Sequence, residues 1–279
     1  MFDVKRLIKK TIKLFFAKRP VYTTANIVTL SPHNRLVNKK IVITGGSRGL
    51  GYFMAKKFVS EGAEVLIAGR NASTLQKVAN EIGCKYLLLD VQNVSSFEDF
   101  LKESDRLLGG INCLVNNAGI SLHEEGILHV SPEDFDAQIN TNFKGAFFLS
   151  KAFIARCNEK KEECIKNILF VTSETGITVD ERPYGLTKAA LNSLVQGLAY
   201  RFISRGYRIN AIAPGITATE MTGINREGNL YCDGMPTKRY YLPEEVAEIA
   251  CFMLSDASNL LNGQIIVCNE GKTINARWK

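Results

Sequence analysis

The chain has 279 residues, of which 46% are hydrophobic and 23% charged, a composition typical of a globular protein with a sizeable core. The formal net charge is +7, but residues 1–40 carry ten Lys or Arg and a single acid, whereas the rest of the chain has 25 basic and 27 acidic residues. The body of the protein is therefore not expected to bind nucleic acid.

The cysteine pattern and the hydropathy indicate the redox state and the cellular compartment of the protein. Seven cysteines occur without Cys-x-x-Cys spacing or a nearby His cluster, which argues against a metal site and against a closed disulfide framework. The sequence has no apolar run of about 18 residues, as a membrane span needs, and its N-terminus lacks the apolar stretch of a signal peptide. We expect a reduced, cytoplasmic protein.

The N-terminal segment has a helical pattern of its own. Apolar side chains recur at helical spacing between basic ones over residues 4–15, which predicts a basic amphipathic helix. Three partners are compatible with it: its own or a neighbouring subunit, an anionic membrane surface contacted peripherally, or an acidic protein such as an acyl carrier protein. We expect residues 1–38 to be an appended arm, with such contacts made by residues 1–16, and residues 39–279 to form one domain.

From residue 39 onward, short apolar runs alternate with amphipathic stretches. The predicted strands are Lys40–Thr44, Glu64–Ala68, Lys85–Asp90, Ile111–Val115, Asn167–Thr172, Arg208–Ile212 and Gln264–Cys268. The predicted helices are 49–61, 73–82, 95–108, 132–157, 183–205 and 243–254. Apolar strands that alternate with helices predict right-handed βαβ units. The expected fold class is α/β, a Rossmann-type doubly wound parallel β-sheet of about seven strands with helices on both faces.

A glycine-rich sequence follows the first predicted strand. Residues 44–51 read Thr-Gly-Gly-Ser-Arg-Gly-Leu-Gly and run directly into a helical pattern. Glycines permit a tight turn, and they let backbone N–H groups approach a pyrophosphate at the positive end of the helix. Between a strand and a helix, this loop predicts a dinucleotide site rather than an ordinary turn. The expected contacts are Gly45, Ser47, Arg48, Gly49, Leu50 and Gly51.

The end of the second strand indicates which dinucleotide would bind. Sites that prefer NAD carry an acid about 20 residues beyond the glycines, where it binds the adenosine ribose. Here that position holds Arg70, followed by Asn71, and Arg48 lies in the glycine loop. Two guanidinium groups would bind a 2′-phosphate, so the sequence predicts NADP(H) over NAD(H). The alternative is a pair of solvated surface arginines.

A second group of residues has the chemistry of proton transfer. Tyr184 and Lys188 lie four positions apart, on one face of a predicted helix. A nearby ammonium favours the phenolate, so Tyr184 becomes a usable proton donor and acceptor. Ser173 ends a predicted strand, at the sheet edge where α/β proteins bind ligands. Asn142 lies in the predicted helix 132–157, either as part of this site or as a capping or core-bridging asparagine.

Together these motifs resemble the short-chain dehydrogenase/reductase family in its single-domain form. The resemblance covers about residues 38–272 in unbroken order, and it includes Tyr184-x-x-x-Lys188 and Asn116-Asn117-Ala118-Gly119. It implies that residues 39–279 are a catalytic domain and that the chain is an NADP(H)-dependent oxidoreductase. Such an enzyme moves a hydride between a nicotinamide and a ketone or alcohol, as a carbonyl reductase or, in reverse, a secondary alcohol dehydrogenase.

The resemblance also implies a role for each matching residue. Tyr184 would protonate the developing alkoxide and Ser173 would hydrogen-bond the substrate oxygen. Lys188 would hold the nicotinamide ribose and lower the pKa of Tyr184, and Asn142 would anchor a water relay. No metal is implied. The remaining cofactor contacts would be Asp90 and Val91 at the adenine, Asn117, Ala118 and Gly119 at the ribose, and Pro214, Gly215, Thr217 and Thr219 at the nicotinamide.

Two departures from the family pattern concern the substrate end. Ser173 and Tyr184 lie eleven positions apart, closer than in many members, which predicts a shortened loop and a changed substrate pocket. Asn269-Glu270-Gly271 stands after the last strand, where the family usually has Asp-Gly-Gly, and this change is expected to affect the exit of that strand.

The sequence leaves the substrate and the oligomeric state open. A segment expected to select the substrate, residues 220–241, is mixed apolar and aromatic, and a 3-oxoacyl thioester, a sugar or polyol and a small secondary alcohol all stay open. Glu174 and Arg182 either favour a polar substrate or belong to a solvated loop. The resemblance implies a homodimer or homotetramer through 132–157 and 183–205. The alternative to an enzyme is an NADPH-binding sensor or scaffold without turnover.

Overall fold

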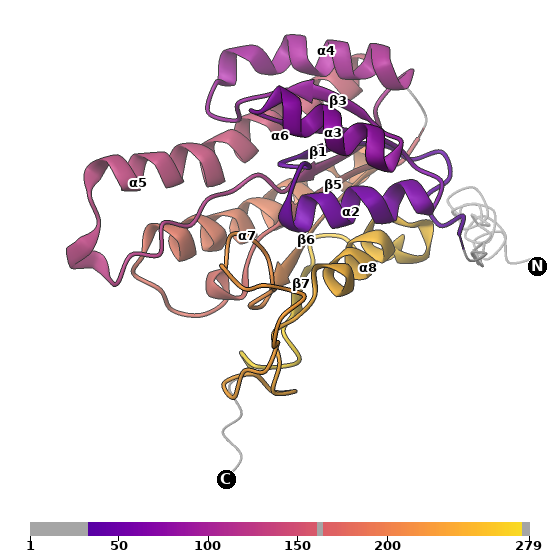
Figure 1. Ribbon diagram of the computed structural model, residues 1–279. Helices are drawn as coiled ribbons and strands as arrows, with labels where there is room; N and C mark the ends of the chain where they lie inside the picture. The colour runs from indigo at the N-terminus through magenta and orange to yellow at the C-terminus, as the bar shows by residue number, and fades with distance from the viewer. Residues whose placement is uncertain (1–32, 161–163, 275–279) are drawn as a thin grey trace, which may run out of the picture.

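The seven strands form one parallel sheet in the computed structural model, which describes residues 33–160 and 164–274 (Figure 1). The strand order is β3-β2-β1-β4-β5-β6-β7, so the chain crosses from one side of β1 to the other between β3 and β4. The carboxyl ends of β1 and β4 therefore flank a topological switch point, where sheets of this kind bind ligands. The strands are β1 (Lys40–Thr44), β2 (Glu64–Gly69), β3 (Lys85–Leu88), β4 (Cys113–Asn116), β5 (Lys166–Val171), β6 (Tyr207–Pro214) and β7 (Ile265–Cys268).

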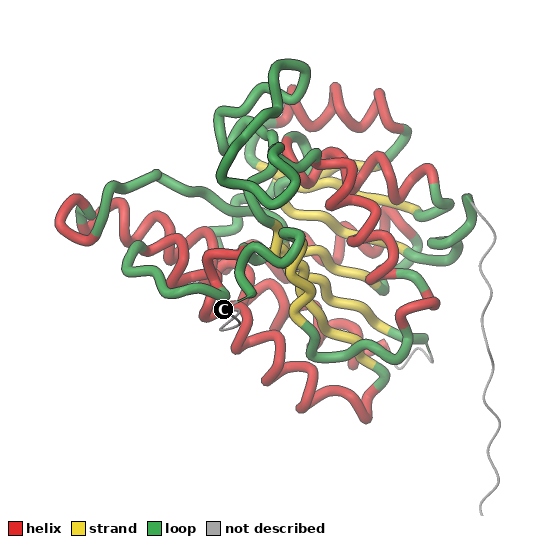
Figure 2. The backbone as a smooth tube through the Cα atoms, turned by 90° about the horizontal axis from the view of Figure 1, so that it is seen from below, coloured by secondary structure: helices red, strands yellow, loops and turns green. Residues whose placement is uncertain are grey.

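Helices cover both faces of this sheet, as Figure 2 shows from below. One apolar core lies beneath α2 (Gly49–Ser60), α3 (Ala72–Ile82) and α8 (Pro243–Leu254). The other lies beneath α4 (Phe97–Leu108), α6 (Ala146–Lys160) and α7 (Pro183–Phe202). Because both faces of the central strands are buried, those strands are apolar throughout, which is the pattern that predicted them. The doubly wound parallel fold is confirmed.

The predicted helix 132–157 is interrupted in the structure. It divides into α5 (Pro132–Gln138), a π-helical segment Ile139–Gly145, and α6. The wider turn leaves Gly145 directly against the backbone of Val91, where an added Cβ would lie 2.5 Å from the Val91 carbonyl oxygen. π-helical turns occur often at functional sites, and this one contains Asn142. The prediction of one uninterrupted helix was wrong here, because apolar periodicity does not reveal an inserted residue.

Packing onto the domain begins a few residues before residue 39. Leu36 is fully buried in the core beneath α2 and α8, and the Arg35 guanidinium donates to Glu61 at 2.5 Å and to Glu248 at 2.9 Å. The helix predicted over residues 4–15 lies outside the described residues. No helix among the described residues is both long enough and apolar enough to cross a membrane.

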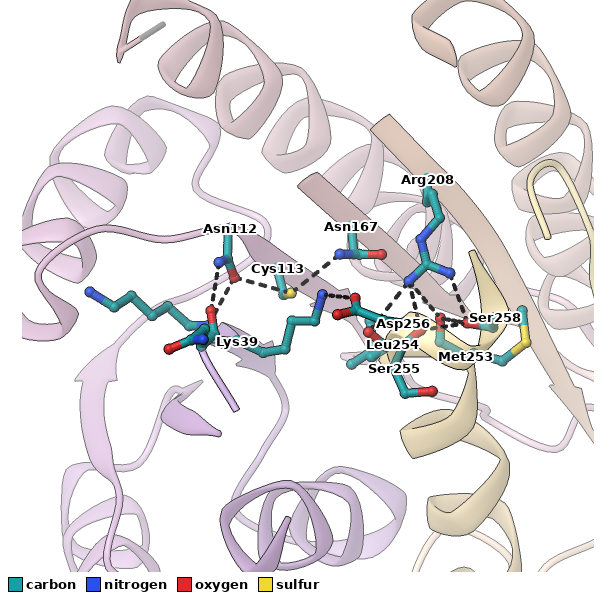
Figure 3. Close-up of polar contacts among 12 residues, drawn as sticks. Lys39, Asn112, Cys113, Asn167, Arg208, Met253, Leu254, Ser255, Asp256 and Ser258 are labelled. Carbon is teal, nitrogen blue, oxygen red and sulfur yellow. Dashed lines mark hydrogen bonds and ion pairs between the residues drawn. The ribbon is translucent and has the colours of Figure 1, made fainter. Parts of the chain in front are cut away.

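Buried polar side chains gather at the amino edge of the sheet, opposite the ligand-binding edge (Figure 3). Arg208 is 6% exposed and donates to Ser258 Oγ at 2.7 Å and to the Ser255 carbonyl at 3.1 Å, which satisfies carbonyls at the end of α8. Lys39 pairs with Asp256 at 2.7 Å. These contacts join the end of α8 to the starts of β1 and β6, so the cluster stabilises the fold.

Candidate active site

A cavity of about 1250 Å³ opens at the carboxyl edge of the sheet. The loops after six of the strands contribute to its walls, because parallel strands bring all their carboxyl ends to one side. All but two of the predicted site residues line it. The lining members of that set are Gly45, Ser47, Arg48, Gly49, Leu50, Arg70, Asn71, Asp90, Val91, Asn117, Ala118, Gly119, Ser173, Tyr184, Lys188, Pro214, Gly215, Thr217 and Thr219.

Gly51, one of the two exceptions, lies behind the glycine loop and shapes it. A Cβ on Gly51 would lie 2.1 Å from the Gly45 carbonyl oxygen and 2.6 Å from Asn117 Nδ2. That amide nitrogen donates to the carbonyls of Thr44 at 2.8 Å and of Gly45 at 3.1 Å. Gly45 has a φ of +66°, a conformation that favours glycine. Side chains at these positions would push the loop away from α2, whose N-terminus faces the cavity.

Two exposed arginines line the part of the cavity formed by the glycine loop and the end of β2. Neither Arg48 nor Arg70 makes a side-chain hydrogen bond or ion pair with any described residue. Asn71 caps α3, since its Oδ1 accepts from the Thr74 backbone N–H at 2.9 Å. Arg70 therefore occupies the position at which NAD sites carry an acid that binds the ribose. This donor set fits a phosphorylated ribose, because a group with five N–H donors and no partner of its own matches a phosphate.

Thr44 belongs to the site, although the sequence analysis did not select it. Its buried hydroxyl accepts from the backbone N–H groups of Asn117 at 3.1 Å and Ala118 at 3.0 Å. It therefore holds the loop after β4 against the glycine loop, where Asn117 to Gly119 line the cavity. Asp90 lies on the same rim, and its Oδ1 accepts from the Gln92 backbone N–H at 3.0 Å. The only signal for Thr44 was its position before the glycines.

Ser173, Tyr184 and Lys188 converge on the cavity from β5 and α7. Lys188 is 4% exposed, and its Nζ donates to the Val171 carbonyl at 2.9 Å and lies 5.5 Å from the centre of the Tyr184 ring. Ser173 lies two residues after the end of β5, and its Oγ accepts from the Thr175 backbone N–H at 3.2 Å. Burial lowers the pKa of Lys188 to about 8.

The pKa of Tyr184 moves in the direction opposite to the one expected. Burial raises it above the ordinary value, and a hydrogen bond with Ser173 offsets only part of that rise. Burial and Ser173 are the causes of this shift, and Lys188 is not among them. The predicted lowering of the Tyr184 pKa by Lys188 is therefore corrected. Tyr184 is protonated at neutral pH, as a proton donor to a carbonyl oxygen must be.

Asn142, the other exception, is buried just beneath the cavity. Its Nδ2 donates to the Ile120 carbonyl at 2.8 Å, and its Oδ1 accepts from the Ile120 N–H at 2.8 Å. Both ends of the amide thus bind one backbone unit, which is the core-bridging alternative left open above. Gly119 separates it from Lys188: a Cβ there would lie 3.4 Å from Asn142 Oδ1 and 3.5 Å from Lys188 Nζ.

The far end of the cavity is formed by the predicted substrate segment, the loop after β5 and the loop after β4. Met221 and Tyr240 of the predicted substrate segment line it, as do Glu174 and Arg182. Arg182 donates from Nε to Asp180 at 2.8 Å. Residues 120–124 also line the cavity and were missed, although their place directly after Gly119 could have indicated them. Among the described residues, no three His, Cys, Asp or Glu side chains are placed to hold a metal ion.

Comparisons with known proteins match most of the chain. A family model described as enoyl-(acyl carrier protein) reductase matches residues 45–273. The 3-oxoacyl-[acyl-carrier-protein] reductase FabG of Aquifex aeolicus is 31% identical over 245 residues, which cover 85% of this chain and 98% of the relative. The gluconate 5-dehydrogenase of Gluconobacter oxydans is 32% identical over 251 residues, covering 86% and 96%.

Solved structures agree with these sequence matches. A short chain dehydrogenase from Burkholderia cenocepacia in complex with NADP is 28% identical, with a TM-score of 0.75, and covers 86% of this chain and 99% of that one. A 3-ketoacyl-(acyl-carrier-protein) reductase from Brucella melitensis complexed with NADH is 27% identical, with a TM-score of 0.78, and covers 86% and 100%. The chain belongs to the short-chain dehydrogenase/reductase family. It is a nicotinamide-dependent oxidoreductase, and the predicted family, fold and enzyme class are confirmed.

Proposed function

We propose that the protein is an NADPH-dependent reductase of ketones, with Ser173, Tyr184 and Lys188 as its catalytic residues. The observation that carries this proposal is their convergence on one cavity together with two arginines that have no partner among the described residues. A nicotinamide bound there supplies the hydride. Nothing in this arrangement favours the alternative of a sensor or scaffold, since a protein that only binds NADPH needs no buried lysine beside a protonated tyrosine.

The residues at the reacting end have separate roles in this proposal. The Ser173 hydroxyl donates to the carbonyl oxygen of the substrate and holds it beside Tyr184. The Tyr184 hydroxyl then gives its proton to that oxygen as negative charge develops on it. Lys188 stabilises the resulting phenolate. Asn142 fixes Ile120 and the adjacent Gly119, and so holds this wall of the cavity beside Lys188.

The preference for NADPH rests on Arg48 and Arg70. A guanidinium without a protein partner binds a 2′-phosphate through charge-assisted hydrogen bonds, whereas a bare ribose offers it no anion. The two solved relatives were complexed with NADP in one case and NADH in the other, so the proposed preference rests on these two arginines and not on the relatives. Asp90 and Val91 would contact the adenine, and Thr217 and Thr219 the carboxamide.

The substrate proposed is a polar ketone, either a 3-oxoacyl thioester or a keto form of a sugar acid. Curated relatives of both kinds match the chain at similar identity. The test is NADPH oxidation with acetoacetyl-CoA and with 5-ketogluconate as probes. Turnover of either supports the proposal, whereas NADPH binding without turnover across a broad panel of ketones would revive the sensor alternative.

The pH dependence of ketone reduction should follow Lys188. Its pKa is lowered to about 8, so the ammonium loses its charge as the pH rises through that value, while Tyr184 with its raised pKa stays protonated. We expect kcat/KM for reduction to be level between pH 6 and 7 and to fall above about pH 8, by at most about tenfold per pH unit. A profile measured at constant ionic strength that stays level to pH 10 would contradict this role of Lys188.

We also propose that the protein forms a homo-oligomer through the helices that follow β4 and β5. Apolar side chains on α6 and α7 are exposed, among them Phe147 at 39% and Leu186 at 47%. Light scattering after size exclusion would check this, and a monomer at micromolar concentration would contradict it.

A further inference from the structure

The turn after β7 connects two parts of the active site that are distant in sequence. Figure 1 shows the segment between β6 and α8, in orange, beside the segment after β7, in yellow. Three residues of that turn contact the site: Asn269 and Lys272 bind the loop after β5, and Glu270 binds the segment before α8. We call these three residues the C-terminal clamp.

One side of the clamp holds Glu174, which directly follows Ser173. This carboxylate is 7% exposed and lines the cavity. Its Oε2 accepts from Asn269 Nδ2 at 2.9 Å, and its Oε1 accepts from Lys272 Nζ at 2.8 Å. Both oxygens are therefore bound by the clamp, so Glu174 is a fixed wall rather than a free charge in the cavity.

The other side of the clamp depends on Glu270, whose backbone is strained. Its φ is +54°, in the left-handed region that disfavours residues other than glycine. The side chain makes contacts that glycine could not, because Oε2 accepts from Thr237 Oγ1 at 2.7 Å and from the Tyr241 hydroxyl at 3.4 Å. Strain retained beside a functional site is an indication of function.

Both sides of the clamp meet at Gly215. A Cβ on this glycine would lie 2.7 Å from the Tyr241 ring, 3.0 Å from Asn269 Cβ and 3.2 Å from Glu174 Oε2. Tyr241 also extends the turn that follows Gly215, since its N–H donates to the Ile216 carbonyl at 3.1 Å and its carbonyl accepts from Ala218 at 2.8 Å. The clamp thus encloses the turn that leads to Thr217.

We propose that Glu270 is a positioning residue that holds the turn over residues 214–219 in the shape that binds the nicotinamide. This inference rests on the proposed function, because it takes Thr217 and Thr219 to contact the carboxamide. Glu270 acts through Tyr241 and Thr237 and touches no reacting atom. The left-handed backbone is retained because the side chain is needed for these two contacts.

The test compares Glu270→Gly with wild type in two binding titrations and one melting curve. The ligands are NADPH and 2′-phospho-ADP-ribose, which has the same adenosine end but lacks the nicotinamide. Glycine removes the contacts and relieves the strain, so Tm should not fall. We expect affinity for NADPH to drop about tenfold, the effect of one lost charge-assisted hydrogen bond, while affinity for 2′-phospho-ADP-ribose stays unchanged. Glu270→Gln, whose amide oxygen still accepts from Thr237, should recover most of the NADPH affinity.

Three results would overturn the proposal. Unchanged NADPH affinity in Glu270→Gly would show that the clamp does not reach the nicotinamide. Equal weakening of both ligands with a lower Tm would mark Glu270 as a structural residue. Wild-type protein that binds both ligands equally would show that the turn contributes nothing to nicotinamide binding. Because all readouts are binding and melting, a failure to reduce any ketone would contradict the proposed function without altering these outcomes.

Discussion

Replacing Tyr184 by Phe should abolish ketone reduction and leave NADPH binding intact. The variant keeps the half-buried ring beside Lys188 and removes only the hydroxyl that donates the proton. Proton donation by a positioned side chain contributes about 10²- to 10⁴-fold to a rate, so we expect kcat to fall by about that factor. The measurements are kcat with the ketone that gives turnover and NADPH affinity by fluorescence.

Tyr200→Phe is the matched control, because Tyr200 lies on the same helix but is 88% exposed. It should leave kcat within about twofold of wild type, as expected for a surface hydroxyl. Retention of most of the activity in Tyr184→Phe would rule out Tyr184 as the proton donor. Loss of NADPH binding together with activity would instead indicate that the hydroxyl shapes the cofactor site.

Replacing Arg70 by Asp should invert the cofactor preference. The guanidinium has no partner among the described residues, so its removal breaks no contact within that part of the protein. Losing the charge-assisted bonds to the 2′-phosphate and adding a repulsive carboxylate should weaken NADPH roughly a hundredfold. NADH should bind better than to wild type, because the new acid can accept from the ribose hydroxyls.

The control for this prediction is Lys77→Asp, on the exposed face of the helix that follows Arg70. It makes the same kind of charge change without lining the cavity, and it should alter NADPH affinity by less than about threefold through long-range electrostatics alone. Equal affinity of wild type for NADPH and NADH would contradict the 2′-phosphate site. It would direct the substrate search to alcohol oxidation with NAD.

The sheet was predictable because each buried strand is a continuous apolar run. Val42 and Ile43 in β1 are buried against opposite cores, and a strand that must be apolar on both faces stands out from its surroundings. The turn at Gly45 was predictable for a similar local reason, since glycine tolerates the left-handed backbone that the turn requires. Features set by one short stretch of chain can be read from that stretch.

The parts that sequence analysis missed depend on contacts between distant segments. Burial raises the Tyr184 pKa, and no local sequence pattern predicts that burial. The sequence left Glu174 open between favouring a polar substrate and belonging to a solvated loop, yet Lys272, 98 positions away, binds it. The π-helical turn at Asn142 is fixed by its bonds to Ile120. Contacts of this kind become visible only in the folded structure.

The most direct test of hydride transfer at this site is a deuterium experiment. The protein is incubated with the ketone that gives turnover and with NADPH that carries deuterium on the transferred face of C4. The alcohol product is predicted to contain deuterium at the former carbonyl carbon in wild type, and Tyr184→Phe should form almost none of it. Alcohol that contains no deuterium with either C4 epimer of the labelled cofactor would contradict direct hydride transfer.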